Sequence, residues 1–245
     1  MKIGIVGAGG HGRVILDLIL ESRGMEPAGF FDQRTGGEGP LGWPILGNET
    51  SLVENWPGLR LDGVVVAIGE NRTRRRIYEK LSAKGIPLVS VIHRRAQVSR
   101  FAQIGAGTVI CAGAVVGPGA VIGDNCIINT GASVDHDCRV KNHAHLCPGS
   151  VLAGTVTVGE EAMLGTGTVV IPGITIGNKT ITGAGSVIIR DLPDNLLVAG
   201  VPARLIRHLE EEEDDQGKKT NNQPGSEKKT DNRTGLGEKT NNWSG

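Results

Sequence analysis

The 245-residue sequence is poor in aromatic residues, balanced in charge and free of long apolar runs. It has three Trp, one Tyr and three Phe against 38 Gly, which favours a narrow aliphatic interior with many tight turns over a broad core. Lys plus Arg and Asp plus Glu each number 26, so charge indicates neither a nucleic-acid nor an anionic-membrane partner. The start MKIGIVGAGG lacks the shape of a signal peptide, and no apolar run reaches the roughly 18 residues that a membrane span needs. We therefore expect a cytoplasmic protein without membrane insertion.

A six-residue repeat dominates the middle of the chain. Every sixth residue from Ile92 is aliphatic, with Thr182 as the exception. The repeat positions are Ile92, Val98, Ile104, Ile110, Val116, Ile122, Ile128, Val134, Val140, Leu146, Leu152, Val158, Leu164, Val170, Ile176, Thr182 and Ile188. Gly often stands one or three places after the aliphatic residue, and the fifth place is usually small. Each hexad is therefore predicted to form a short strand and a corner, with its aliphatic side chain pointing inward.

Three hexads would close one triangular coil of 18 residues, and such coils would stack at the interstrand spacing of about 4.8 Å. Residues 92–191 then give about five to six coils. A β-sandwich, the alternative, would show alternating segments roughly every 8 to 12 residues and would not keep a six-residue phase. In the coils, Cys111 and Cys147 would lie about 9.5 Å apart, too far for a disulfide. With Cys126 and Cys138 they form no C-x-x-C pair, so we expect four reduced core cysteines.

The first 91 residues follow a different pattern, that of a Rossmann-like parallel α/β domain. The segment KIGIVGAGGHGRVILDLILESRG indicates a strand, a glycine turn and a helix. Gly7, Gly9 and Gly12 form G-x-G-x-x-G, and Asp32 ends the next predicted strand about 20 residues later. A loop over residues 34–48, a strand in DGVVVAIG, a helix in NRTRRRIYEKLSAKG and a strand in IPLVSVI complete a unit of about four strands.

This first domain is too short for the usual nicotinamide-binding fold. Such a site uses two mononucleotide-binding halves, and the hexads begin before a second half has room. The N–H groups at the start of its first helix would still attract a phosphate, such as that of a nucleotide-linked sugar. A Rossmann-like cap without any ligand remains the alternative.

Titratable residues gather in residues 129–149, where the hexads are least regular. Here His136 stands between Asp135 and Asp137. An imidazole titrates near pH 6.5, and a neighbouring carboxylate raises its basicity, which suits a general base that deprotonates an amine or hydroxyl. The alternative is an exposed histidine beside solvated aspartates.

The same stretch holds three histidines, His136, His143 and His145, which allows a zinc hypothesis. The gamma-class carbonic anhydrases, which share this architecture, use one ligand about two coils before a closely spaced pair. Two coils before His143 and His145 this chain has Gly107 and Val109. We therefore expect no metal.

The sequence resembles the sugar O- and N-acetyltransferases of the NeuD and PglD type over about residues 2–207. The resemblance is carried by VGAGGHGRV, the strand ending in Asp32, VVVAIGEN around Gly69, NTGASVDHDCRV, HAHLCPGSVLAG and LPDNLLVAGVPARLIR. It implies that the hexads form a left-handed β-helix over residues 92–207. It further implies a homotrimer with active sites between subunits and acetyl-CoA as the acyl donor.

The resemblance also assigns roles in the β-helix. The family's catalytic histidine falls on His136, and the acid that tunes it, which is Glu in some relatives, falls on Asp137. Asn129 matches a residue that orients the acceptor, and His145 one that contacts acetyl-CoA. Two further positions match places where the cofactor meets the backbone, Thr166 and Ala184.

In the first domain the resemblance implies a sugar-nucleotide site. Gly9, Gly10 and His11 match the turn that holds the nucleotide, and Gly69 matches a second contact. A pair near the base and ribose, often two acids in relatives, falls on Asp32 and Gln33. Because Gln33 departs from that pattern, the nucleotide stays open, and free sialic acid or another activated sugar stays possible.

The last segment, residues 208–245, is expected to be a disordered tail. It contains an acidic run from Glu210 to Asp215 and then repeats a polar ten-residue unit, KKTNNQPGSE, KKTDNRTGLG and EKTNNWSG. Such a composition cannot bury enough apolar surface to offset the entropy of ordering.

Taken together, the sequence predicts an acetyl-CoA-dependent acetyltransferase that modifies an amino sugar, a nucleotide-linked amino sugar such as a UDP-4-amino sugar, or sialic acid. Two other hypotheses stay open at this point. One is a non-catalytic β-helix scaffold, and the other is a nicotinamide-dependent oxidoreductase.

Overall fold

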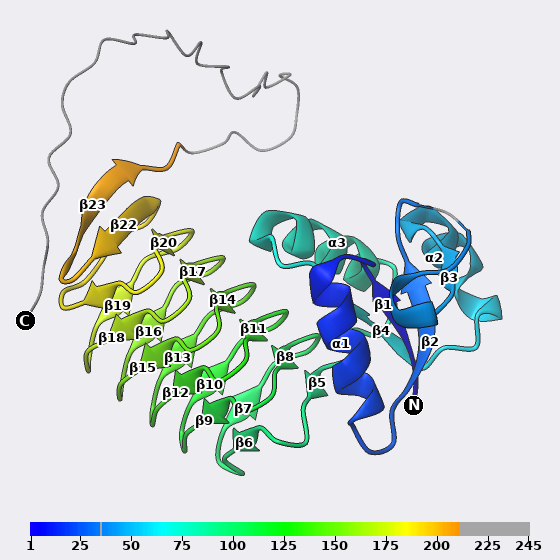
Figure 1. Cartoon of the computed structure of the whole chain (residues 1–245), viewed down its shortest axis with the longest axis horizontal. Coiled ribbons are helices and arrows are strands. Elements are labelled where there is room, and N and C mark those ends of the chain that lie inside the picture. Colours follow the sequence, from blue (N-terminus) through cyan, green and yellow to red (C-terminus); the bar gives the residue numbers. More distant parts are fainter. Residues whose placement is uncertain (35, 211–245) are drawn as a thin grey trace, which may run out of the picture. The chain divides into compact units, whose positions relative to one another are not determined.

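The computed structural model describes residues 1–34 and 36–210, and the expectation of a disordered tail falls outside them from residue 211 onward. A small α/β part is followed by a long stack of coils, and both belong to one compact unit (Figure 1). The predicted fold class is therefore confirmed: a parallel α/β domain followed by a left-handed parallel β-helix.

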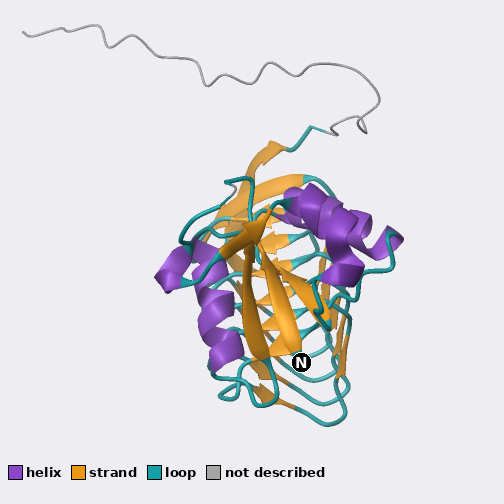
Figure 2. Cartoon of the chain, turned by 90° about the vertical axis from the view of Figure 1, so that its right-hand side faces the viewer, coloured by secondary structure: helices purple, strands orange, loops and turns teal. Residues whose placement is uncertain are grey.

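The α/β part contains a four-stranded parallel sheet with the strand order β3-β2-β1-β4. Its elements are β1 (Lys2–Val6), α1 (Gly10–Leu20), β2 (Glu26–Phe31), a 3-10 turn (Pro40–Gly42), β3 (Ile45–Gly47), α2 (Glu49–Asn55), a 3-10 turn (Trp56–Gly58), β4 (Gly63–Val66) and α3 (Asn71–Ala83). Strand side chains alternate between two cores, because successive residues of a strand face opposite sides. Ile5 packs with α1, whereas Val64 and Val66 pack with α2 and α3. The helices thus cover both faces of the sheet (Figure 2).

The fourth strand differs from the sequence prediction. It is Ile45–Gly47, inside the expected loop, and it pairs with β2. The IPLVSVI segment instead makes an isolated bridge between Val64 and Leu88 and then enters the coils as β5. Tertiary packing explains why this segment joins the coils and not the sheet. Val91 packs in the core under α1, so that β5 closes the open end of the coil stack.

Seventeen two-residue strands cover residues 91–188 and form three parallel faces. The first face holds β5 (Val91–Ile92), β8 (Val109–Ile110), β11 (Ile127–Ile128), β14 (His145–Leu146), β17 (Met163–Leu164) and β20 (Ile181–Thr182). The second holds β6 (Gln97–Val98), β9 (Val115–Val116), β12 (Ser133–Val134), β15 (Val151–Leu152), β18 (Val169–Val170) and β21 (Val187–Ile188). The third holds β7 (Gln103–Ile104), β10 (Val121–Ile122), β13 (Arg139–Val140), β16 (Thr157–Val158) and β19 (Thr175–Ile176).

The register confirms the 18-residue coil, since Val121 pairs with Gln103 below and Arg139 above. We name the corners by the faces they join: the first corner joins the first and second faces, the second corner the second and third, and the third corner the third and first. The third residue of most corners has a left-handed backbone, as at Gly113 (φ 69°) and Asp137 (φ 59°). Gly is favoured there because a Cβ is penalised in this conformation.

The exceptional Thr182 is also accommodated inside. It is buried, its Oγ1 lies 2.7 Å from Oγ1 of Thr168, and it accepts a hydrogen bond from the Gly165 N–H. A buried hydroxyl is tolerated when it is hydrogen-bonded in this way. All four cysteines are buried and free, as the sequence predicted.

The coils end in an antiparallel hairpin, β22 (Leu196–Gly200) and β23 (Ala203–His208), added to the first face beside β20. Among the residues that the structure describes, no helix has the length and apolar character needed to span a bilayer.

Candidate active site

The general base predicted from sequence lies at the second corner, after β12. The side chain of His136 is about half exposed, and its Nδ1 donates to Oδ2 of Asp137 at 2.9 Å. The backbone N–H of His136 donates to Oδ1 of Asp135 at 2.7 Å. An ionised carboxylate accepts only, so this pairing places the ring proton on Nδ1 and leaves Nε2 as a proton acceptor.

Two glycines of the neighbouring coils make room for this pair. A Cβ on Gly154 would lie 2.5 Å from Nε2 of His136, and one on Gly119 would lie 2.4 Å from Oδ1 of Asp137. The absence of these side chains lets the imidazole lie across the following coil and the carboxylate across the preceding one.

The acids beside the ring raise its basicity. The hydrogen bond that the ring donates to Asp137 contributes most to raising the pKa of His136, and the charge of Asp135 adds to it. A general base works best when its pKa lies near the working pH, so this increase suits proton abstraction near neutrality.

A second cluster joins the β-helix to the α/β part. His145, on β14, lies with its Nδ1 3.2 Å from the carbonyl oxygen of Gly69 and its Nε2 3.1 Å from Nδ2 of Asn129. The Asn129 amide is oriented in turn, because its Oδ1 accepts from the N–H of Thr130 at 2.8 Å. A carbonyl oxygen can only accept, so Nδ1 of His145 carries the proton and Nε2 accepts from Asn129.

The histidines of this cluster are held neutral. Burial and then the charge of Arg74 lower the pKa of His145 to about 4, and the same two causes lower the pKa of His11 to about 4. The two imidazoles lie near enough for a charge on His11 to lower the pKa of His145. The structure therefore brings together four residues that the sequence placed in separate motifs: His11, Gly69, Asn129 and His145.

The glycines of the turn before α1 have two different roles: some are required by the fold, and others border open space. Gly7 has φ 108°, and a Cβ on Gly12 would lie 2.3 Å from the Gly7 carbonyl oxygen, so both are needed for the fold. A Cβ on Gly9 or Gly10 would meet nothing within 4 Å. The backbone at Gly9 and Gly10 thus borders open space at the start of α1, where N–H groups favour an anion.

Asp32 lies directly against this turn. Its Oδ2 accepts from the Ala8 N–H at 2.8 Å, and its Oδ1 accepts from Nε of Arg34 at 3.0 Å. Burial raises the pKa of Asp32, but these hydrogen bonds outweigh it, so the pKa lies below its usual value. Gln33 is exposed beside it.

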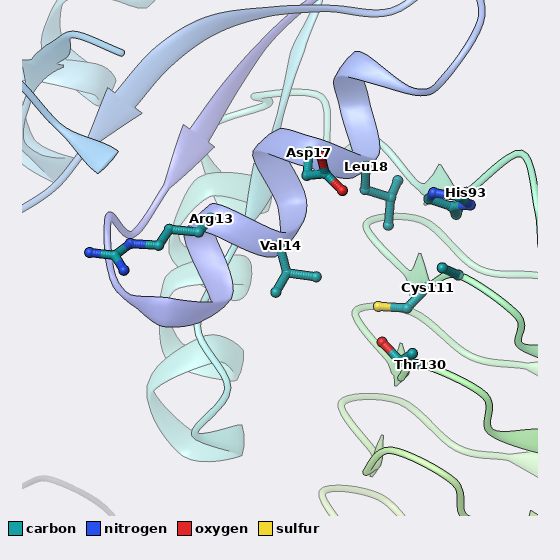
Figure 3. Close-up of a pocket in the computed structure, with 8 residues that line it drawn as sticks. Arg13, Val14, Asp17, Leu18, His93, Cys111 and Thr130 are labelled. Atoms are coloured by element: carbon teal, nitrogen blue, oxygen red, sulfur yellow. The ribbon is translucent and has the colours of Figure 1, made fainter. Parts of the chain in front are cut away.

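Thr166 and Ala184 are exposed in one column of the first corner, one coil apart. Two coils below Thr166 in the same column is Thr130, which lines a cavity of about 290 Å³ between α1 and the coils (Figure 3). Val14 and Leu18 line it from α1, while the coils contribute His93, Cys111, Ala112 and Thr130.

Within a single chain His136 lies apart from the His145 cluster. Asn129 and His136 stand at different corners, before and after β12, and no hydrogen bond or ion pair in the described part of the chain joins His136 to the His145 cluster. His143 is separate again, buried at the third corner with its Nδ1 2.8 Å from Nδ2 of Asn125. In residues 1–34 and 36–210 no group of three His, Cys, Asp or Glu is arranged to hold a metal.

Comparison with known proteins identifies the family. Residues 2–81 match the PglD N-terminal domain, and residues 119–154 match the bacterial transferase hexapeptide (six repeats). A GDP-perosamine N-acetyltransferase from Caulobacter crescentus, solved as a histidine-to-alanine mutant with CoA and GDP-perosamine, is 42% identical. That match covers 84% of this chain and 96% of that one, with a TM-score of 0.80. This chain belongs to the PglD/NeuD-type family of sugar acetyltransferases.

Two further solved structures are similar to this chain. The acetyltransferase domain of PglB from Neisseria gonorrhoeae, solved with acetyl coenzyme A, is 42% identical over 84% of this chain and 98% of that one, with a TM-score of 0.78. WeeI from Acinetobacter baumannii shares the fold at 24% identity, 84% and 100% coverage and a TM-score of 0.73. The protein is therefore an acyltransferase. This excludes the two alternative hypotheses, a non-catalytic scaffold and a nicotinamide oxidoreductase.

Sequence reasoning missed three polar residues around the site. Arg34 holds Asp32 against the turn, and Asn71 and Arg74 join α3 to the coils. Arg74 belongs to the run RTRRR, which has the composition of a solvated helix face. The available signal was the three-residue spacing of Asn71 and Arg74, which places both on one side of a helix directly after Gly69.

Proposed function

We propose that this acyltransferase moves the acetyl group of acetyl-CoA to the amino group of a nucleotide-linked amino sugar. The observation that carries the proposal is 42% identity across 96% of an N-acetyltransferase that was solved with CoA and GDP-perosamine. N–C bond formation and thioester cleavage balance: the amine attacks the thioester carbonyl, loses one proton and forms an amide, while CoA leaves as its thiol.

His136 is the general base of this proposal. Its Nε2 is the free acceptor, while Nδ1 is held by Asp137 at 2.9 Å. As the amine attacks, Nε2 takes the amine proton, and the resulting imidazolium is stabilised by the carboxylates of Asp137 and Asp135. The same imidazolium can return the proton to the departing thiolate.

The turn before α1 is proposed to hold the nucleotide diphosphate. Gly9 and Gly10 border open space at the helix start, and α1 is eleven residues long, so its first N–H groups and dipole favour a phosphate there. His11 would lie on the same side, and Asp32 with Gln33 would face the nucleoside. Because Arg34 occupies part of the Asp32 carboxylate, the ribose would meet an acid that is already hydrogen-bonded.

The acyl donor is proposed to lie along the first corner. Thr166 and Ala184 are exposed at equivalent positions of successive coils, in the column of the first corner that also contains Thr130. A ligand extended along the stack would therefore pass them in succession. Its reactive end would reach the two successive coils that carry Asn129 and His145, with Asn129 orienting the acceptor amine.

A homotrimer would complete the site. Within one chain His136 and Asn129 stand at opposite ends of β12, and the second face between them exposes the side chains of Val115, Val151 and Val169 to 38%, 39% and 40%. Ile171 and Ile189 extend this apolar surface along the second corner. Exposed apolar patches mark interaction surfaces, and a closed ring of three would set His136 of one subunit against Asn129 of the next. A cytoplasmic location stays a prediction.

The acceptor class is tested by thiol release from acetyl-CoA with GDP-perosamine, a UDP-4-amino sugar, the matching free amino sugars and sialic acid. We expect kcat/KM for a nucleotide-linked amino sugar to exceed that of the free sugar by about 10- to 100-fold, because charge-assisted hydrogen bonds to phosphate contribute about 1.5–3 kcal/mol. Thiol release with none of these acceptors, or with sialic acid alone, would contradict the proposal.

Asp137→Asn is expected to move the acidic limb of the kcat/KM profile to lower pH. The base acts only when neutral, and its folded pKa is raised above 6.5, so activity rises with pH through that raised value. Removing the carboxylate removes the largest cause of the increase. Asp135→Asn should move the limb in the same direction by less, since its contribution ranks second. A limb that stays in place in both variants would show that another group titrates.

A further inference from the structure

A buried arginine stands behind the His145 cluster. Arg74, on α3, is 1% exposed, and every nitrogen of its guanidinium is hydrogen-bonded. Nε donates to the carbonyl oxygen of Asn125 (3.1 Å), Nη1 to those of Ile68 (3.1 Å) and Gly69 (3.1 Å), and Nη2 to that of His143 (2.7 Å) and to Oδ1 of Asn71 (2.8 Å). One side chain thus joins the loop before α3 to two successive coils.

This cation has no carboxylate in contact. In the part of the chain that the structure describes, no ion pair includes Arg74, and the charges of Glu70 and Glu161 reach it only through space. Burial lowers the pKa of Arg74 to about 10, so it stays protonated at neutral pH. Burying a charge without an opposite charge is costly unless hydrogen bonds compensate for it. All five acceptors of Arg74 belong to α3, the loop before it and the coils that carry the His145 cluster, which points to a role in the site.

Arg74 leads to Asn129 through a continuous set of hydrogen bonds. The Gly69 carbonyl oxygen accepts from both Arg74 Nη1 and His145 Nδ1. His145 Nε2 then accepts from the Asn129 amide, whose Oδ1 is held by the N–H of Thr130. If His145 were protonated, its Nε2–H would oppose the Asn129 N–H as donor against donor, and this set would break.

We propose that Arg74 is a positioning residue, which fixes the Gly69 carbonyl so that neutral His145 holds the Asn129 amide toward the acceptor sugar. This inference rests on the proposed function, because Asn129 orients the acceptor only if the sugar is acetylated beside it. Arg74 itself touches neither substrate. Its planar fork of five donors suits this task, since Lys offers a single point charge at the same place.

The test is a double-mutant cycle between Arg74→Lys and Asn129→Ala, read as kcat for acetyl transfer to GDP-perosamine or the best acceptor of the panel. Alone, Arg74→Lys should lower kcat by about 10- to 100-fold, because misplacement by about 1 Å can cost 10² in rate. In the Asn129→Ala background the same change should cost less than about twofold, since residues that act as one unit are not additive. Arg76→Lys, on the exposed side of the same helix, is the matched control and should leave kcat unchanged.

Equal losses from Arg74→Lys in both backgrounds would overturn the inference, because a merely structural role lowers activity regardless of Asn129. If Asn129→Ala alone leaves kcat unchanged while the wild type transfers acetyl, the role of Asn129 is wrong and the inference falls with it. If no acceptor is acetylated by the wild type, the proposed function fails first. These outcomes are distinct.

Should Arg74→Lys fail to fold, Asn71→Ala replaces it in the cycle, because it removes the Oδ1 that holds Nη2.

Histidine ¹⁵N NMR on the wild type gives a readout besides activity. The ionisable groups that face His145 are Arg74 of α3 and His11 of α1, while its strand neighbours Ile127 and Met163 are neutral. We expect His145 to stay in the neutral Nδ1–H form at pH 6. Protonation near its ordinary pKa of 6.5, or the Nε2–H form, would overturn the inference.

Discussion

Replacing His136 by alanine is expected to lower kcat/KM for acetyl transfer by about 10²- to 10⁴-fold, the usual contribution of a positioned general base. The side chain is about half exposed, so the fold should persist. Both expectations follow from its position at a corner, where the ring is hydrogen-bonded to Asp137 and lies against Gly154 of the next coil. Thiol release under subsaturating acceptor measures the loss, and thermal unfolding checks the fold.

His208→Ala is the matched control, because His208 is also an exposed histidine but lies on β23. It should retain wild-type kcat/KM. A second check is the pH profile, since the acidic limb of the wild type should vanish in His136→Ala when its base is gone. An unimpaired His136→Ala enzyme would show that another residue, or water alone, takes the proton.

Mixed trimers are expected to recover activity that two inactive variants lack. One subunit carries His136→Ala and the other carries Asn129→Ala with His145→Ala, and the two are co-expressed in equal amounts. Random assembly should give about a quarter of the wild-type sites, since about three quarters of the trimers are mixed and each closed ring then has one intact interface of three. The physical reason is that His136 and the Asn129 cluster occupy different corners of each chain.

A subunit that carries all three substitutions provides the control. Co-expressed with His136→Ala it can form no intact interface, so activity should stay at the level of the variants alone. If the first mixture also stays at that level while mixed trimers are present by mass, the sites lie within single chains. Sedimentation of the wild type independently reports whether three copies associate.

Much of the fold followed from local pattern. The phase from Ile92 to Ile188 sets which side chains point inward, and an 18-residue coil follows because each strand must pair with the one above it. The exception at Thr182 did not break the stack, since Thr168 supplies its hydrogen bond. The position of the fourth sheet strand was not predictable in this way. Ile45–Gly47 is too short to give a period, and the more apolar IPLVSVI was used to close the coils.

The candidate site was likewise predictable from the sequence only in part. Sequence alone placed His136 beside Asp137, because neighbours in the chain stay neighbours in a corner, and it marked the glycine turn by its spacing. Tertiary structure decided that Gly69, Asn129 and His145 form one cluster. Stacking of successive coils joins Asn129 to His145, and packing of the loop before α3 against the coils joins Gly69 to them. Tertiary structure also turned Arg74, one cation in a basic run, into the buried centre of that contact, because burial depends on which helix face the coils cover.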